Sequence, residues 1–143
     1  VTGALFGIIA AVYYWWPKWT GRMYSERWAK FHFWWTMVFV NLLFFPQHFL
    51  GLAGMPRRIP DYNVVFADWN LISSIGAFGM FATPFIMAFV LWHSLKHGKK
   101  AEARAWEEAH GLEWTVPSPA PHHTFEVPPV IKAGDLAHDD VSH

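Results

Sequence analysis

The sequence predicts an all-α transmembrane protein with two complete transmembrane helices, preceded by the end of a third and followed by an extended polar C-terminal tail. Three uncharged apolar runs lie at Val1–Trp16, Phe31–Phe45 and Trp69–Leu95, and short polar blocks separate them. Of the 143 residues, 53% are hydrophobic and 19% aromatic, which is unlike a water-soluble domain. The last third instead carries most of the charge and many prolines.

These patterns divide the chain into six predicted segments. They are the end of a transmembrane helix (1–17), a loop on the matrix or cytoplasmic side (18–25), a transmembrane helix (26–46), a loop with an arginine pair on the opposite side (47–67), a second transmembrane helix (68–97) and a soluble tail (98–143).

Charge and cysteine content exclude some classes of function. The formal net charge is zero, so we expect no nucleic-acid partner. Cysteine is absent, which excludes disulfides and thiolate metal sites.

The first run, Val1–Trp16, has no charged residue. As a helix it would be roughly 24 Å long at about 1.5 Å per residue, short of the ~30 Å hydrocarbon core of a bilayer. We therefore interpret it as a transmembrane helix that lacks its beginning. The alternative is an interfacial amphipathic helix, but such a helix carries a charged face and this run has none.

The second run continues a helix that we expect to start near Glu26, with Ser25 as its N-cap. Pro46 is expected to break or kink this helix. The third run follows a predicted N-cap at Asp68 and contains Pro84, which predicts a kink. Small residues in its first half would let a neighbouring helix approach closely; they are Ser73, Ser74, Gly76, Ala77 and Gly79.

After Lys96 the sequence becomes polar. Ala101–His110 is expected to form a short surface helix, and the proline-rich sequence from Gly111 onward an extended strap.

Arg57 and Arg58 stand at the end of the loop between the two complete spans. Two guanidinium groups at a membrane face are costly unless an anion neutralises them. No acidic residue occurs between Glu26 and Asp61, and only Asp61 and Asp68 lie near the pair. We therefore favour an anion supplied from outside this stretch; the alternative is that both side chains snorkel to phospholipid head groups.

The distribution of basic residues predicts the topology. Two complete spans return the chain to its starting side, so Lys18–Lys30 and Lys96–Lys100 should share one face. This basic face is expected to be the cytoplasmic or matrix side, with Arg57 and Arg58 on the other.

Three stretches carry a resemblance to a known family. They are Trp28-Ala29-Lys30-Phe31-His32-Phe33, the segment FFPQHFLGLAGMPRR at Phe44–Arg58, and Trp69–Gly76. They resemble the last two transmembrane helices, and the loop between them, of subunit I of the haem-copper cytochrome c oxidases. Gly3–Phe6 is similar to the later part of the family's tenth helix, and Glu113–Trp114 and His122–Glu126 are similar to its C-terminal tail.

The resemblance implies that the chain is the C-terminal part of a catalytic subunit that transfers electrons from cytochrome c to dioxygen with proton pumping. In the family the arginine pair bonds the propionates of the haems, so Arg57 and Arg58 are expected to bind haem A. His32, Asn41 and Phe44 are secondary candidates for cofactor contact. The family's iron and copper ligands lie on earlier helices, so no catalytic residue and no metal ligand is expected in this chain. We favour a separately encoded part of a split subunit over a piece of a longer chain.

The expected partners are the remainder of subunit I, other oxidase subunits, cytochrome c as donor to the complex, and the lipid bilayer. The expected location is the mitochondrial inner membrane, or alternatively a bacterial plasma membrane, with the tail on the matrix or cytoplasmic side. Two other functions stay open: the same part of a haem-copper quinol oxidase, and an accessory membrane scaffold that does not contact haem.

Several histidines have two interpretations. In the family, a proposed proton or water pathway passes near the position that matches His32, but a buried histidine that bonds a neighbouring carbonyl is the more common case. His93 and His97 have a spacing that suits zinc, yet they sit where a helix C-terminus favours positive charge. His48 and the pair His122 and His123 are not expected to bind metal.

Overall fold

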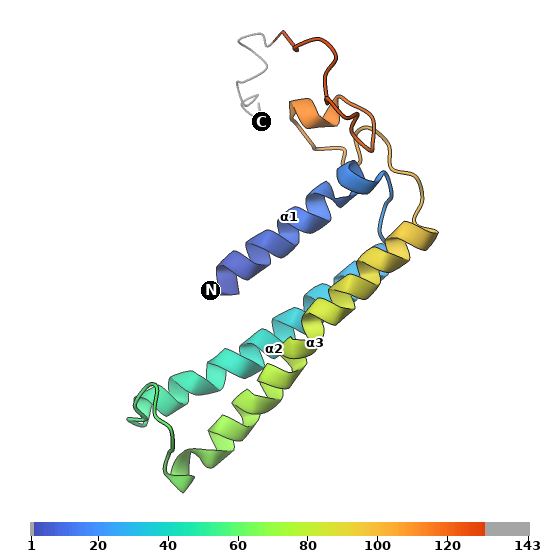
Figure 1. Cartoon of the computed structure of the whole chain (residues 1–143). Coiled ribbons are helices and arrows are strands. Elements are labelled where there is room, and N and C mark those ends of the chain that lie inside the picture. Colours follow the sequence, from blue (N-terminus) through green and yellow to red (C-terminus); the bar gives the residue numbers. More distant parts are fainter. Residues whose placement is uncertain (1, 131–143) are drawn as a thin grey trace, which may run out of the picture.

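The computed structural model of the protein describes residues 2–130, and its secondary structure is helical (Figure 1). The elements are α1 (Thr2–Thr20), α2 (Glu26–Leu52), the 3-10 helix η1 (Val64–Phe66), α3 (Ala67–His97) and the 3-10 helix η2 (Leu112–Trp114). Within residues 2–130 there is no β-strand, and only an isolated antiparallel bridge joins Arg22 to Lys100. The predicted all-α class is confirmed.

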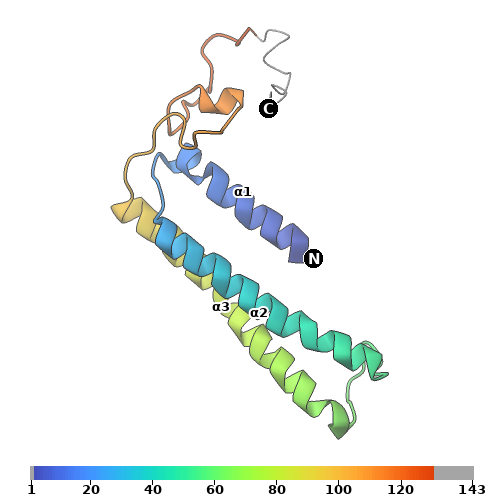
Figure 2. The same ribbon diagram turned by 180° about the vertical axis from the view of Figure 1, so that it is seen from behind.

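Helices α2 and α3 form a long antiparallel hairpin, and the shorter α1 lies beside it, as both opposite views show (Figures 1 and 2). Within the described residues, Glu26–Leu52 and Val64–His97 are the two helical stretches long and apolar enough to cross a membrane. These stretches correspond to the two complete spans that the sequence predicts.

The α2–α3 contact depends on small residues, as expected. A Cβ atom built on Gly76 would lie 2.6 Å from the Cα atom of Leu43, so only glycine allows the two backbones to come this close. The Ser73 hydroxyl donates to the Leu43 carbonyl at 2.7 Å, and the Trp35 indole donates to the Gly79 carbonyl at 2.9 Å. Both bonds satisfy polar groups that lipid could not.

Helix α2 does not end at Pro46 but continues to Leu52, so the predicted boundary is wrong by six residues. Pro46 is buried inside the helix. The helix is closed instead by Gly54, two residues after its end, whose φ of 86° is in the left-handed region. There the amides of Gly54 and Met55 donate to the carbonyls of Gly51 and Leu50 at 3.1 and 3.0 Å, which is the pattern of a Schellman C-cap.

The other helix ends also differ from expectation. Helix α1 passes through Pro17 to Thr20. Ser25 occupies the N-cap position of α2 without a side-chain hydrogen bond to the helix. Asp68 is not an N-cap, because η1 precedes α3 and the Asn63 side chain accepts from the Val65 amide at 3.2 Å in its place.

No helix forms at Ala101–His110, contrary to prediction. The segment instead folds against the end of α1. The Trp106 indole donates to the Tyr14 carbonyl at 2.9 Å, and the Ala103 carbonyl accepts from Lys18 Nζ at 2.8 Å. In a free helix, the Trp106 side chain would point to solvent and the Ala103 carbonyl would accept from an amide of the same helix.

The first part of the predicted tail packs against the end of α1. Trp114 is 2% exposed and Lys18 is 4% exposed. The Lys18 ammonium donates to the carbonyls of Ala103 and Val116, each at 2.8 Å, and lies 5.1 Å from the centroid of the Trp114 ring. His122 and His123 are exposed. Val1 and residues 131–143, which include the end of the predicted tail, lie outside the described residues.

Candidate functional site

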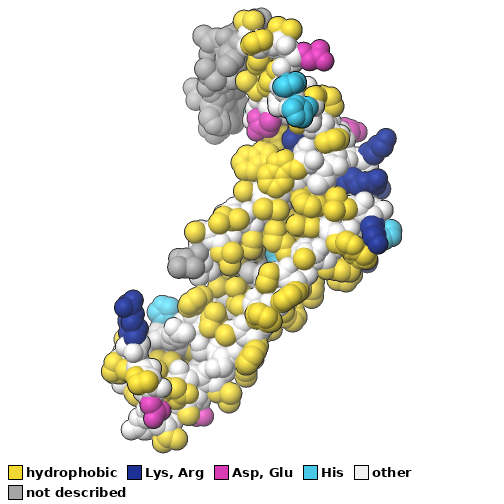
Figure 3. Space-filling view, viewed as in Figure 1, with side chains coloured by type: hydrophobic (Ala, Val, Ile, Leu, Met, Phe, Trp, Pro, Cys, Tyr) yellow, Lys and Arg dark blue, Asp and Glu magenta, His cyan; other side chains and the backbone are white. Residues whose placement is uncertain are grey.

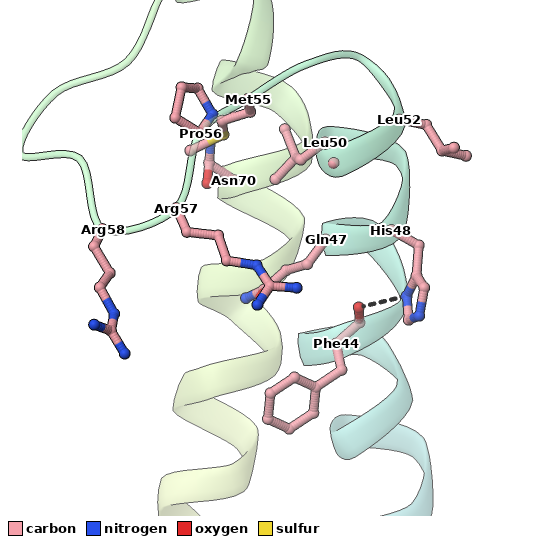
Figure 4. Close-up of a pocket in the computed structure, with 11 residues that line it drawn as sticks. Phe44, Gln47, His48, Leu50, Leu52, Met55, Pro56, Arg57, Arg58 and Asn70 are labelled. Atoms are coloured by element: carbon pink, nitrogen blue, oxygen red, sulfur yellow. Dashed lines mark hydrogen bonds between the residues drawn. The ribbon is translucent and has the colours of Figure 1, made fainter.

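The arginine pair lines an open cavity of about 760 Å³ at the closed end of the α2–α3 hairpin (Figure 4). Its walls come from the last turns of α2, the following loop and the first turns of α3. The lining residues are Phe44, Gln47, His48, Leu50, Gly51, Leu52, Met55, Pro56, Arg57, Arg58 and Asn70.

Both arginines are exposed, and both side chains descend from the loop on the same side of it. The Arg57 guanidinium extends over the groove between the helices beside Gln47, whereas Arg58 hangs clear of both helices (Figure 4). Among residues 2–130, neither has a carboxylate oxygen within 4.0 Å. Asp61, the nearest acidic residue in sequence, accepts a hydrogen bond from the Tyr62 amide at 2.8 Å.

Arg58 also has an unusual backbone. Its φ is 58°, in the left-handed region that residues other than glycine, asparagine and aspartate rarely adopt. Such conformations cost on the order of 1–3 kcal/mol and concentrate at ligand-binding sites. The loop therefore holds the backbone of Arg58 in a conformation that the free chain would avoid.

Three polar side chains line the same cavity as the arginines, and the sequence did not assign them to a site. The Gln47 amide donates to Ser73 Oγ at 3.1 Å, and Asn70 donates to the Phe66 carbonyl at 2.9 Å. His48 Nδ1 lies 3.1 Å from the Phe44 carbonyl oxygen. Only closure of the hairpin brings Asn70 to the cavity, so no local sequence signal could have identified it.

The structure brings Phe44 to the arginine pair but not the other two candidates. Asn41 lines a separate groove of about 700 Å³ on α2 and α3 whose other lining residues are apolar. Its amide donates to the Met37 carbonyl one turn earlier, at 2.7 Å.

His32 is 1% exposed, and its Nδ1 atom lies 3.1 Å from the hydroxyl of Tyr13 on α1. The Tyr13 hydroxyl is therefore the hydrogen-bond partner of Nδ1. His32 Nε2 and the hydroxyl of Thr83 on α3 are both buried and have no hydrogen-bond partner among the described residues. All three helices thus contribute to one buried polar cluster, well separated along α2 from the arginine cavity.

Within the described residues there is no group of three or more His, Asp or Glu side chains that could hold a metal ion. His93 and His97 lie with ring centroids 4.9 Å apart at the end of α3.

The cavity combines positive charge with apolar surface. Two guanidinium groups supply charge and paired N–H donors for carboxylates. Phe44 and Leu50 supply apolar surface.

Comparison with known proteins identifies the family of the chain. The family profile described as "Cytochrome C and Quinol oxidase polypeptide I" matches residues 1–79. The chain is 50% identical over 126 residues to cytochrome c oxidase subunit 1 of Cereibacter sphaeroides, an alignment that covers 87% of this chain and 22% of that protein. It is 40% identical over 138 residues to cytochrome c oxidase subunit 1 of Bacillus sp. strain PS3, covering 94% of this chain and 22% of that protein.

The chain thus spans about a quarter or less of the length of these relatives. The profile matches more than half of the chain, from α1 to the middle of α3. The chain therefore belongs to the cytochrome c and quinol oxidase polypeptide I family.

Proposed function

We propose that this chain forms the C-terminal part of the catalytic subunit of a cytochrome c oxidase and that Arg57 and Arg58 bind haem propionates there. The observation that carries the proposal is the exposed arginine pair on a cavity without a carboxylate partner among residues 2–130. The family's cofactor is haem A, which supplies the electron-transfer and dioxygen chemistry when bound.

The residues of this chain would hold the cofactor without ligating iron. A guanidinium can give two parallel N–H bonds to a carboxylate, and each charge-assisted bond contributes about 1.5–3 kcal/mol. The positive charge of the two guanidinium groups would also stabilise the electron-rich, reduced state of the cofactor that they contact. Phe44 would pack against the ring system, and Gln47 and Asn70 would line the polar rim.

The whole oxidase would pass electrons from cytochrome c to dioxygen and pump protons, with iron and copper ligands on the remainder of subunit I. The family also includes quinol oxidases, but both relatives named above are cytochrome c oxidases. This favours cytochrome c as the donor. An accessory scaffold without haem contact is disfavoured because it would have no use for an arginine pair on a cavity that has no carboxylate partner among residues 2–130.

Both named relatives are bacterial. We therefore place the chain in a bacterial plasma membrane in preference to the mitochondrial inner membrane. The basic end that joins α1 to α2 and carries the tail would face the cytoplasm.

Replacing both arginines by lysine tests the propionate role. The double variant R57K/R58K keeps both charges but loses bidentate geometry, so the assembled oxidase should retain less haem or show a shifted haem midpoint potential. Haem content and a spectroscopic redox titration measure the two effects. Arg27→Lys, at an exposed position on the opposite end of the hairpin, is the matched control.

Unchanged haem content together with an unchanged redox titration in the double variant would count against the propionate role. Single variants separate the two positions, and Arg58→Asn removes the charge while keeping a residue that tolerates the left-handed backbone.

A further inference from the structure

A row of exposed aromatic side chains runs along α3 and ends at a lysine. Phe85, Phe89, Trp92 and Lys96 are spaced at four, three and four residues, which places them on one face of the helix. The three aromatic residues are 63%, 41% and 50% exposed. The Lys96 ammonium lies 4.3 Å from the centroid of the Trp92 ring, so the row and the charge are in contact.

Further cations adjoin Lys96 on a backbone that hydrogen bonds hold in place. The bridge between Arg22 and Lys100 is closed by two bonds of 2.8 Å, from the Met23 amide to the Lys99 carbonyl and from the Ala101 amide to the Gly21 carbonyl. The Arg22 guanidinium donates to the Gly98 carbonyl at 3.0 Å. Figure 3 shows Lys and Arg side chains gathered where α3 meets the following segment.

These cations lack neutralising partners nearby. Among residues 2–130, the only side-chain ion pair is Glu26 with Lys30, at 2.8 Å. Lys96, Lys99 and Lys100 are exposed, and Arg22 is partly exposed. The cluster of Arg22, Lys96, Lys99 and Lys100, here called the cationic cluster, therefore offers a fixed positive surface to an anion.

The depth of the cluster identifies the anion. Lys96 is in the last turn of α3, at the end of a stretch long enough to span a bilayer, and Trp92 beside it is typical of the membrane interface. The apolar row then extends from this level toward the middle of the hairpin.

We propose that one anionic phospholipid binds here, with its phosphate at the cationic cluster and an acyl chain along Phe85, Phe89 and Trp92. An acidic protein segment would satisfy the charges but not the aromatic row that lies within the bilayer. A zwitterionic lipid would fill the row but gain little from the cluster, because its own ammonium opposes the cations.

Native mass spectrometry of the assembled oxidase tests the proposal, with phosphatidylglycerol as the probe and phosphatidylcholine as the comparator. The unmodified complex should retain phosphatidylglycerol more strongly than phosphatidylcholine. Each lysine near an anionic lipid surface contributes roughly a fivefold change in affinity, so K96Q/K99Q/K100Q should weaken phosphatidylglycerol binding on the order of a hundredfold. The control E26Q/K30Q removes the exposed ion pair and should leave retention unchanged.

Three results would overturn the proposal: equal retention of the two lipids by the unmodified complex, unchanged phosphatidylglycerol retention in the triple variant, or equal loss in the control. If the triple variant does not assemble, Lys99→Gln alone should still weaken binding about fivefold, by the same contribution per lysine. Haem content should not change in these variants, which separates this site from the arginine cavity.

Discussion

The buried His32 side chain on α2 forms a hydrogen bond whose contribution to stability can be measured. His32 is the largest buried polar side chain of the spans, and within the described residues its only side-chain hydrogen bond is to Tyr13. The same bond joins α1 to α2. An imidazole that loses this partner would have a buried Nδ1 atom without a side-chain hydrogen bond inside residues 2–130.

Tyr13→Phe should therefore destabilise the assembled protein by about 1–3 kcal/mol, the cost of leaving a buried polar group without a partner. Tyr14→Phe is the matched control, because the Tyr14 hydroxyl makes no hydrogen bond among the described residues. The midpoint of detergent-induced denaturation of the complex measures both. A Tyr13→Phe midpoint equal to that of the control would show that another group satisfies His32.

For single residues, the sequence predicted where charges lack nearby partners better than it predicted which side chains meet in the fold. The scarcity of acidic residues around Arg57 and Arg58 could be seen in the sequence, and the structure places no carboxylate of residues 2–130 within 4.0 Å of them. Asn70 could not be predicted to join them, because its place at the cavity depends on the register of α2 against α3. Asn41 was polar in an apolar run, but its amide is used by its own helix.

At the scale of elements, glycine determines how α2 and α3 pack. Gly76 is buried against the Leu43 backbone, which cannot move without shifting the whole helix. Gly79 faces the Phe39 ring, and this side chain can move aside by adopting another rotamer. Gly76 is therefore the less tolerant of the two positions.

Gly76→Ala should destabilise the protein by about 1–3 kcal/mol through overpacking, despite the better helix propensity of alanine. Gly7→Ala in α1 has nothing within 4 Å of its new Cβ atom and should be neutral or stabilising by up to about 1 kcal/mol. Thermal denaturation of the two variant complexes compares them. Equal stability would mean that α2 and α3 are not in this register in the assembled protein.

Helix existence was predictable, whereas helix ends were not. Long uncharged runs identified α2 and α3, because a helix satisfies all backbone hydrogen bonds within one segment in lipid. The end of α2 was placed too early because proline was given more weight than the glycine cap that follows it. Ala101–His110 has helix-forming residues, but docking onto α1 uses its backbone carbonyl at Ala103.

At the scale of the whole molecule, the described part of the tail is tied to the start of the chain. The Lys18 ammonium, beyond the apolar part of α1, holds carbonyls from two separate tail positions. Burial lowers the pKa of this ammonium, and the Glu113 carboxylate partly opposes the effect. Lys18 therefore holds its proton less tightly when the tail is docked than when it is undocked. Docking of the tail should accordingly strengthen as the pH rises toward the ordinary lysine pKa.

Lys18→Met should release the tail, because the Ala103 and Val116 carbonyls both lose their donor. A protease that cleaves after glutamate should then cut at Glu107 and Glu108 several-fold faster, and the pH dependence of cleavage caused by Lys18 should disappear. Lys30→Met, at an exposed position in α2, is the control. Cleavage of the Lys18 variant at the control rate would show that the aromatic contacts around Trp114 hold the tail without the lysine.

The chain should not be stable without the rest of the oxidase. Helix α1 contacts the hairpin through a few groups, among them Tyr13 with His32 and Trp16 with Ser94, and large apolar side chains on all three helices are exposed. In a complete subunit I, neighbouring helices would cover much of this surface, since the named relatives are more than four times the length of the region they share with this chain. Expressed alone in detergent, the chain should elute as aggregates and melt without a cooperative transition. A monodisperse protein with a sharp thermal transition would contradict this expectation, and it would mean that the hairpin and the docked tail form a unit that folds by itself.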